Sequence, residues 1–97
     1  MTVELDRHTM RVAYEGQSFR CTKSEFAVCQ ALSEHPGHIL SRAQLLDAID
    51  PTKANEVYER VIDQHVKRVR NKMRNVFGFH CIEAINGVGY AWRQRTH

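Results

Sequence analysis

The side chains most able to do chemistry lie between positions 60 and 75, where basic and amide residues alternate with aliphatic ones. On a helix with about 100° per residue, four apolar side chains fall within about 40° of Ile62 and form one stripe: Ile62, Val66, Val69 and Met73. The opposite face carries the polar residues Arg60, Gln64, Lys67, Arg68, Asn71 and Asn75. Arginine and lysine bind phosphates and guanine edges, while glutamine and asparagine bind adenine edges. The pattern therefore favours a helix whose exposed face binds nucleic acid.

Two polar flanks border the apolar stripe. Asp63, Arg70 and Arg74 form one flank, and His65 and Lys72 form the other. No acidic residue lies between Asp63 and Glu83, so like charges repel one another along this helix unless a polyanion offsets them. The repelling side chains are Lys67, Arg68, Arg70, Lys72 and Arg74.

Asp63 has two possible roles. Its carboxylate can accept a hydrogen bond from a cytosine edge. Alternatively, it can orient Arg60 or Arg70 through a charge-assisted hydrogen bond. We favour the orienting role.

The charge of the chain is unevenly distributed. The whole sequence has 14 Lys and Arg against 11 Asp and Glu, a formal net charge of +3. Residues 1–59 hold 6 basic and 9 acidic side chains, whereas residues 60–97 hold 8 basic and 2 acidic ones. A basic part of this kind is typical of a polyanion-binding protein, although a solvated helix face can have the same composition.

Cysteine and histidine side chains could in principle hold a metal or act in catalysis. The three cysteines, Cys21, Cys29 and Cys81, have no C-x-x-C spacing, and residues 35–38 (His-Pro-Gly-His) read as a turn. Residues 87–89 (Gly-Val-Gly) read as a hairpin tip, not a phosphate loop. We therefore expect no metal, no cofactor and no enzymatic activity, with the cysteines acting as small core residues in a reducing compartment.

The length and composition limit the class of protein. Its 97 residues, 42% hydrophobic and 26% charged, suit one folded domain and exclude whole-chain disorder and a multidomain enzyme. No apolar run approaches the roughly 20 residues of a membrane-spanning helix. The first residues lack the pattern of a secretory signal, so we expect a cytoplasmic protein.

Local signals predict the elements that position these residues. Short strands are expected at 3–5, 11–14 and 18–21. Capping boxes at Thr22–Glu25 and Ser41–Gln44 begin two helices, which end near Glu34 and Asp50. A third helix of roughly 28 Å is expected from Val57 to Asn75, followed by strands at 81–85 and 88–92 around an Asn86-Gly87 turn.

These elements predict an α+β fold of the winged helix-turn-helix type. One domain spans residues 1–97. A short N-terminal antiparallel sheet occupies 1–21, three helices occupy 22–75, and a C-terminal β-hairpin wing occupies 81–93.

The sequence resembles the OmpR/PhoB-type winged-helix effector domain of bacterial response regulators. The resemblance lies in four segments that cover most of the chain in order: Thr22–Phe26, His35–Leu46, Arg60–Met73 and Ile85–Tyr90. It implies that the long helix is a recognition helix in the major groove of DNA.

The resemblance also implies residue roles. The base-reading set is Gln64, Arg68, Asp63 and Lys67, of which Lys67 also lies close to phosphate-holding positions. The phosphate-binding set is Arg60, His65, Arg70 and Tyr90. Asn86, Gly87 and Arg93 belong to the wing, and the segment from Asp50 to Glu59 matches one that can contact RNA polymerase.

Three departures from the family pattern stand out. The wing turn has Asn86 where the family usually has arginine, and Arg93 or Arg95 would then have to supply that contact. The loop after Ile49 lacks the usual aromatic residue, which weakens the expectation of a polymerase contact. No receiver domain with a phosphoacceptor aspartate accompanies the chain, so it is either an excised effector domain or a free-standing one.

The expected function is that of a sequence-specific, double-stranded DNA-binding transcriptional regulator, the effector domain of a two-component response regulator. We expect tandem half-sites, a homodimer on DNA and a receiver domain in the full-length bacterial protein. The alternative is a winged-helix docking module that binds an acidic protein without sequence-specific DNA binding.

Overall fold

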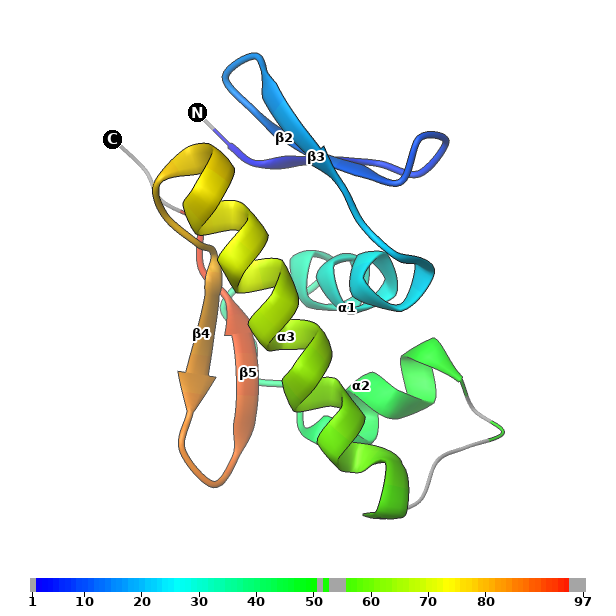
Figure 1. Ribbon diagram of the computed structural model, residues 1–97. Coiled ribbons are helices and arrows are strands. Elements are labelled where there is room, and N and C mark those ends of the chain that lie inside the picture. Colours follow the sequence, from blue (N-terminus) through cyan, green and yellow to red (C-terminus); the bar gives the residue numbers. More distant parts are fainter. Residues whose placement is uncertain (1, 51, 53–55, 95–97) are drawn as a thin grey trace.

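The computed structural model describes residues 2–50, 52 and 56–94, and in the first turn of the last helix, at 56–58, only the backbone. Three strands come first, then three helices, then a β-hairpin (Figure 1). The strands of the first sheet are β1 (Glu4–Asp6), β2 (Arg11–Tyr14) and β3 (Gln17–Arg20). The helices are α1 (Lys23–Ser33), α2 (Arg42–Ile49) and α3 (Glu56–Phe77), and the hairpin consists of β4 (Ile82–Ile85) and β5 (Gly89–Trp92).

The N-terminal sheet is antiparallel in the order β1-β2-β3. Leu5 pairs with Val12, and Val12 pairs with Phe19, so one row of apolar side chains crosses all three strands. Glu15 and Gly16 form the tight turn between β2 and β3, both with positive φ, as a type I′ hairpin turn requires. The predicted strands were correct in number and order, and their ends shift by about one residue.

Both predicted capping boxes form. The Thr22 hydroxyl accepts from Glu25 N at 3.2 Å, and Glu25 Oε1 accepts from Thr22 N at 3.0 Å. Ser41 and Gln44 make the equivalent pair at 3.1 and 2.8 Å. These side chains satisfy amides that have no partner inside the helix and so fix where α1 and α2 begin.

Helix α3 is longer at its C-terminal end than the sequence predicted. It continues two residues past Asn75 to Phe77 and ends before Gly78, whose φ is +86°. Phe77 packs on the rings of Tyr14 and Phe19 in the N-terminal sheet, with centroid separations of 5.7 and 5.4 Å. This tertiary contact extends the helix beyond its local pattern.

The C-terminal hairpin has a third partner. Leu40, predicted only as part of an extended link, pairs with Tyr90 through two backbone hydrogen bonds of 2.8 and 2.9 Å. The hairpin turn covers Asn86, Gly87 and Val88, because Ile85 pairs with Gly89. The wing is therefore attached by β5 to the segment that leads into α2.

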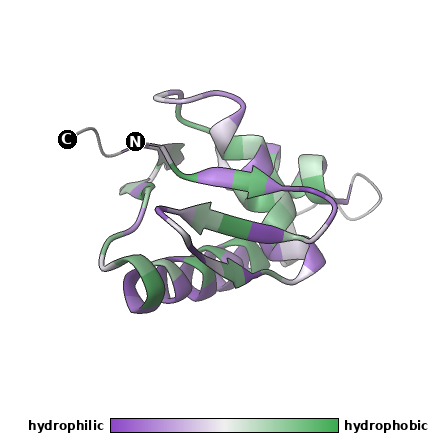
Figure 2. Ribbon diagram, turned by 90° about the horizontal axis from the view of Figure 1, so that it is seen from above, coloured by the Kyte–Doolittle hydropathy of each residue, from purple (hydrophilic) through white to green (hydrophobic). Residues whose placement is uncertain are grey.

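The apolar stripe of α3 forms the centre of the core. Ile62, Val66, Val69 and Met73 are at most 1% exposed. They pack with side chains of α1, α2, the strands and the buried Trp92. Figure 2 shows the N-terminal strands lying over the helices, with hydrophobic and hydrophilic residues alternating along the chain. Among the described residues, no helix combines the length and apolar character needed to cross a membrane.

Candidate nucleic-acid interface

The face of α3 opposite the core is open to solvent, as the sequence predicted. Its side chains are all exposed: Arg60, Gln64, Lys67, Arg68, Asn71 and Asn75. Arg74, expected on the flank with Asp63 and Arg70, is exposed as well. The two flanks lie at the borders of this face, and Asp63, His65, Arg70 and Lys72 are half-buried there. The helix thus presents a row of basic and amide groups while its flanks contact the rest of the domain.

The flank that carries Asp63 faces the wing and the start of α2. The Tyr90 hydroxyl donates to Asp63 Oδ1 at 2.5 Å, and Arg42 Nε lies 3.3 Å from the same oxygen. Asp63 therefore joins α2, α3 and β5 through one carboxylate. The arginine that it orients is Arg42, not Arg60 or Arg70 as we had favoured from the sequence. Arg42 had not been singled out, because nothing local indicates a partner on another helix.

Tyr90 was predicted to bind a phosphate. Its hydroxyl proton is donated to Asp63 in this structure, so a phosphate would have to replace the carboxylate as acceptor. Burial, reinforced by the hydrogen bond and the charge of Asp63, raises the pKa of Tyr90 to about 12. The phenol is thus held in its neutral, donating form throughout the physiological range.

Replacing Asp63 with asparagine should lower the Tyr90 pKa towards the ordinary value of 10.0, because the carboxylate that opposes phenolate formation is removed. We expect the Tyr90 ring carbon next to the hydroxyl to begin titrating by pH 11 in Asp63→Asn but not in the parent protein, as measured by NMR. Tyr90→Phe assigns the signal. An unchanged Tyr90 titration in Asp63→Asn would contradict the role given to this carboxylate.

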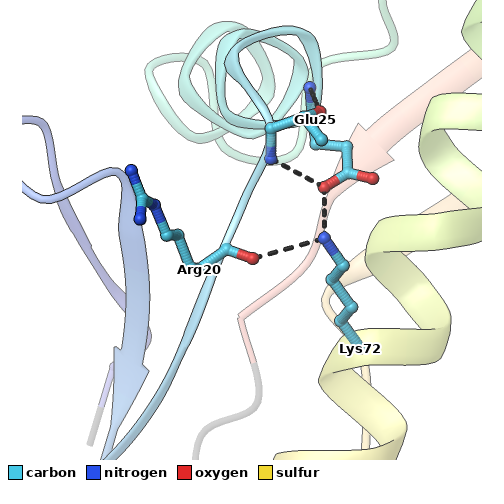
Figure 3. A network of polar contacts seen from close by, with 4 residues as sticks. Arg20, Glu25 and Lys72 are labelled. Carbon is cyan, nitrogen blue, oxygen red and sulfur yellow. Dashed lines mark hydrogen bonds and ion pairs between the residues drawn. The ribbon is translucent and has the colours of Figure 1, made fainter.

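The opposite flank faces α1. Lys72 Nζ lies 2.6 Å from Glu25 Oε1 and donates to the carbonyl oxygen of Arg20 at 3.2 Å (Figure 3). Glu25 is 1% exposed, so its capping-box carboxylate is also the acid of a buried ion pair. Lys72 had been counted among the repelling charges that need a polyanion. That interpretation was wrong for this residue, because an internal acid from α1 neutralises it.

The ionisation of Glu25 reflects opposing effects. Burial disfavours the charged carboxylate, whereas the hydrogen bonds from Lys72 and from the Thr22 amide favour it. The hydrogen bonds and the Lys72 charge outweigh burial, so the pKa of Glu25 is below its ordinary value. His65, on the same flank, has its pKa lowered by burial and by Arg68, against the opposing effect of Glu25. In the free domain this favours the neutral imidazole over the cation.

Arg70 borders the wing side of the exposed face. Burial and the neighbouring Arg74 lower the pKa of its guanidinium, while Tyr90 acts in the opposite direction. Within the part of the chain that the structure describes, Arg70 Nε has no hydrogen-bond partner. Because this nitrogen is buried, it does not support the phosphate role, which stays a prediction.

The wing residues separate into a tip and a base. Asn86, Gly87 and Val88 are exposed at the tip, and a groove of about 430 Å³ runs between them and residues of α2 and α3, including Arg42 and Asp63. Arg93 lies at the opposite end of β5, where its amide bonds to Cys81 and its side chain pairs with Glu83. Four strand residues, about 13 Å, separate Arg93 from the tip. Arg93 therefore does not replace the missing tip arginine.

Two predicted features lie wholly or partly outside the described residues. These are Arg95, the other candidate for the wing contact, and the segment from Asp50 to Glu59, of which Pro51 and 53–55 are not described.

This arrangement is a winged helix-turn-helix domain. It combines two adjoining helices, α1 and α2, with the exposed helix α3 and the β4–β5 hairpin beside it. Residues 16–92 match the family described as "Transcriptional regulatory protein, C terminal", and the chain belongs to this family. The α+β fold and the resemblance expected from the sequence are confirmed.

Curated relatives include response regulators. The chain is 32% identical over 90 residues to the response regulator ArlR of Staphylococcus saprophyticus, covering 93% of this chain and 40% of that protein. It is 33% identical over 90 residues to the transcriptional regulatory protein BaeR of Escherichia coli, covering 91% of this chain and 37% of that protein. The chain thus spans about 40% of the length of these relatives.

Solved structures share the fold. The AdeR DNA-binding domain, in complex with an intercistronic region, has a TM-score of 0.78 at 25% identity, covering 96% of this chain and 95% of that one. The DNA-binding domain of CpxR from E. coli has a TM-score of 0.78 at 24% identity, covering 99% of each chain.

Proposed function

We propose that this domain binds double-stranded DNA sequence-specifically and is the effector domain of a two-component response regulator. Helix α3 enters the major groove, where its exposed side chains meet base edges, and the wing lies against the neighbouring backbone. No catalytic step is part of the proposal.

The observation that carries the proposal is the composition of the exposed face of α3. Arg60, Lys67 and Arg68 share this face with Gln64, Asn71 and Asn75, and between Gln64 and Asn75 the helix has no acidic residue. Basic groups provide affinity for phosphates, and the amides provide donors and acceptors for base edges. We assign base reading to Gln64, Arg68 and Lys67, and phosphate binding to Arg60, His65 and Arg70.

The roles proposed for Asp63 and Tyr90 differ from those expected from the sequence. Because they bond to each other, we propose that they hold the wing against α3 and that Tyr90 reaches a phosphate only by exchanging this partner. Arg42, held by Asp63 at the mouth of the groove, is an additional candidate for a phosphate contact.

The wider assembly is also part of the proposal. One winged helix has a small interface, so two copies on tandem half-sites would bind far more tightly than one. Support for a receiver domain comes from the response-regulator relatives, which are longer than this chain. A cytoplasmic location in a bacterium and a contact with RNA polymerase would follow from that assignment.

Selection from a randomised duplex pool at near-physiological salt tests the function directly. We expect enriched short repeats about one helical turn apart. Recovery without an enriched sequence would contradict sequence-specific readout. Failure to recover DNA even at low salt would contradict DNA binding and favour a protein-docking module.

Two arginines on the exposed face should behave differently. Arg68→Ala is expected to lose discrimination at one or two base pairs, about 1–3 kcal/mol each. Arg60→Ala is expected to weaken all sequences alike and to reduce the slope of log affinity against log salt by about one unit. Fluorescence anisotropy with cognate and mismatched duplexes across a salt series measures both effects.

Arg7→Ala is the matched control, because Arg7 is exposed on the N-terminal sheet side and lies outside the proposed interface. It should leave both the discrimination and the salt slope unchanged. Equal weakening of every sequence by Arg68→Ala would contradict its base-reading role.

A further inference from the structure

An open groove on the α1 side of α3 carries positive charge that the fold does not neutralise. The groove measures about 730 Å³, and its lining comes from the N-terminal sheet, the start of α1 and helix α3: Met10, Arg20, Cys21, Thr22, Lys23 and Lys72. Lys72 is paired with Glu25, so the surplus charge comes from Arg20 and Lys23. Both of these side chains are exposed, and neither makes an ion pair with another described residue.

The sheet places a third cation beside Arg20. Arg11 of β2 pairs directly with Arg20 of β3, so the two side chains leave the same face of the sheet at neighbouring positions. Like charges opposite each other destabilise a sheet. Arg11 has Asp6 as its other cross-strand neighbour, whereas β3 is the last strand and Arg20 has only Arg11. The sheet therefore keeps the charge of Arg20 at a cost that an external anion would offset.

The groove adjoins the exposed face of α3. Lys72 is on the border between them, and the exposed Arg68 lies one turn earlier along the helix. Lys72 Nζ donates to the carbonyl oxygen of Arg20 at 3.2 Å, which brings the end of β3 against this side of α3 (Figure 3). The wing lies on the other side, where Tyr90 bonds to Asp63 (Figure 1). Helix α3 is thus between the wing and the basic groove.

This arrangement fits the two borders of a major groove. The major groove of B-DNA is about 12 Å wide, and a helix inside it has a sugar-phosphate backbone on each side. With the wing against one backbone, as proposed above, the other backbone comes to the α1 side of α3. Exposed cations without internal partners on that side are suited to bind its phosphates.

We propose that Arg20 and Lys23 bind phosphates of the DNA backbone that borders the major groove on the α1 side of α3. The assignment rests on the proposed function, since it takes α3 to lie in the major groove. Phosphate contacts on both sides of the helix fix its depth and orientation but carry no sequence information. Arg20 and Lys23 therefore strengthen binding to every sequence alike.

Fluorescence anisotropy across a salt series, with an enriched duplex and a mixed-sequence duplex, tests the contact. Arg20→Gln and Lys23→Gln should each flatten the slope of log affinity against log salt by about one unit, and the double variant by about two. The affinity advantage of the parent over each single variant should shrink about threefold to fourfold between about 50 and 200 mM salt. The ratio of affinities for the two duplexes should stay as in the parent.

Arg7→Gln is the matched control, because it removes the same charge from the N-terminal sheet side. Arg7 is exposed and does not line the groove, so the salt slope should not change. Equal flattening by Arg7→Gln would show an effect of net charge alone and overturn the assignment. Without DNA, the urea midpoint of Arg20→Gln should not fall, because the substitution relieves the repulsion with Arg11 and keeps the carbonyl oxygen that accepts from Lys72.

Duplexes with neutral methylphosphonate linkages locate the phosphates. Neutralising those that Arg20 and Lys23 bind should weaken the parent and leave the double variant unaffected. Absence of any such set of phosphates, or unchanged salt slopes in both single variants, would overturn the contact while the proposed function stands. Failure of the parent to bind any duplex would overturn both.

Discussion

Replacing Gly89 with alanine is expected to lower the free energy of unfolding by about 3 kcal/mol, the upper part of the range for an overpacked site. A Cβ atom at this position would lie 2.0 Å from the Leu40 carbonyl oxygen and 2.7 Å from its carbonyl carbon. It would also lie 2.9 Å from the Ser41 Cα. All three are backbone atoms, so no side-chain rotation can relieve the overlap.

The surrounding structure also resists a shift. Leu40 and the neighbouring Tyr90 hold the two segments together by two backbone hydrogen bonds. Ser41, the next residue, is the N-cap of α2. Moving this segment away from β5 would therefore break the bridge or displace the start of α2.

Urea unfolding followed by circular dichroism measures the loss, and Gly87→Ala is the control in the same hairpin. A Cβ on Gly87 would meet nothing within 4 Å, and the cost comes only from its φ of +75°. That strain is about 1–2 kcal/mol. If both variants lost the same stability, the close approach of Gly89 to Leu40 would not be the cause.

Replacing Lys72 with methionine should cost about 2–3 kcal/mol at neutral pH. Methionine keeps much of the aliphatic stem but leaves the Glu25 carboxylate buried without its cation. Removing one partner of a buried pair typically costs about 3–5 kcal/mol. We expect less than that here, because the Lys72 side chain is 36% exposed and water partly screens the pair.

The stability cost of Lys72→Met should decrease as the pH falls. The pKa of Glu25 is lowered from 4.5 in the folded protein, so its stabilising contribution is present above pH 4.5 and is lost as the pH falls through the lowered pKa. Without Lys72, burial dominates and should raise the Glu25 pKa above 4.5. Acidification then neutralises the unpaired carboxylate. The stability difference between parent and variant should therefore shrink as the pH approaches 4.

Unfolding midpoints of both proteins between pH 4 and 7 test this expectation. Lys67→Met is the matched control, since Lys67 is exposed on the same helix, and it should change stability by less than about 0.5 kcal/mol. A second background, Glu25→Gln, keeps an oxygen for the Thr22 amide but removes the charge. Lys72→Met should lower the free energy of unfolding less in that background. If the effects of the two substitutions were fully additive in the double mutant, the stabilising role of the Glu25–Lys72 ion pair would be contradicted.

The features predicted well from the sequence depend on neighbours close in the chain. Thr22 with Glu25, and Ser41 with Gln44, mark helix starts because an N-cap and its partner lie three residues apart. The stripe beginning at Ile62 identified the buried side of α3 because helical periodicity is local. The exposed face of the candidate interface followed directly from that stripe.

The features missed depend on contacts between elements distant in sequence. Lys72 and Glu25 are 47 positions apart, and Tyr90 and Asp63 are 27 apart. Charge patterning counted Lys72 among the repelling charges because no local signal places an acid from α1 beside it. The last two residues of α3 were missed for the same reason, since Phe77 is held by aromatic rings of the N-terminal sheet.

The attachment of the wing has a consequence for how this domain can diversify. Leu40 and Asp63 constrain the hairpin through Tyr90, so the part of β5 next to the turn tolerates little variation. Asn86 and Val88 project beyond these attachments and are exposed. These tip residues can therefore be substituted without disturbing the contacts that hold the hairpin against the helices. Under the proposed function, changes at the tip would alter DNA contacts with little loss of stability, and the residues that hold the wing in place need not change with them.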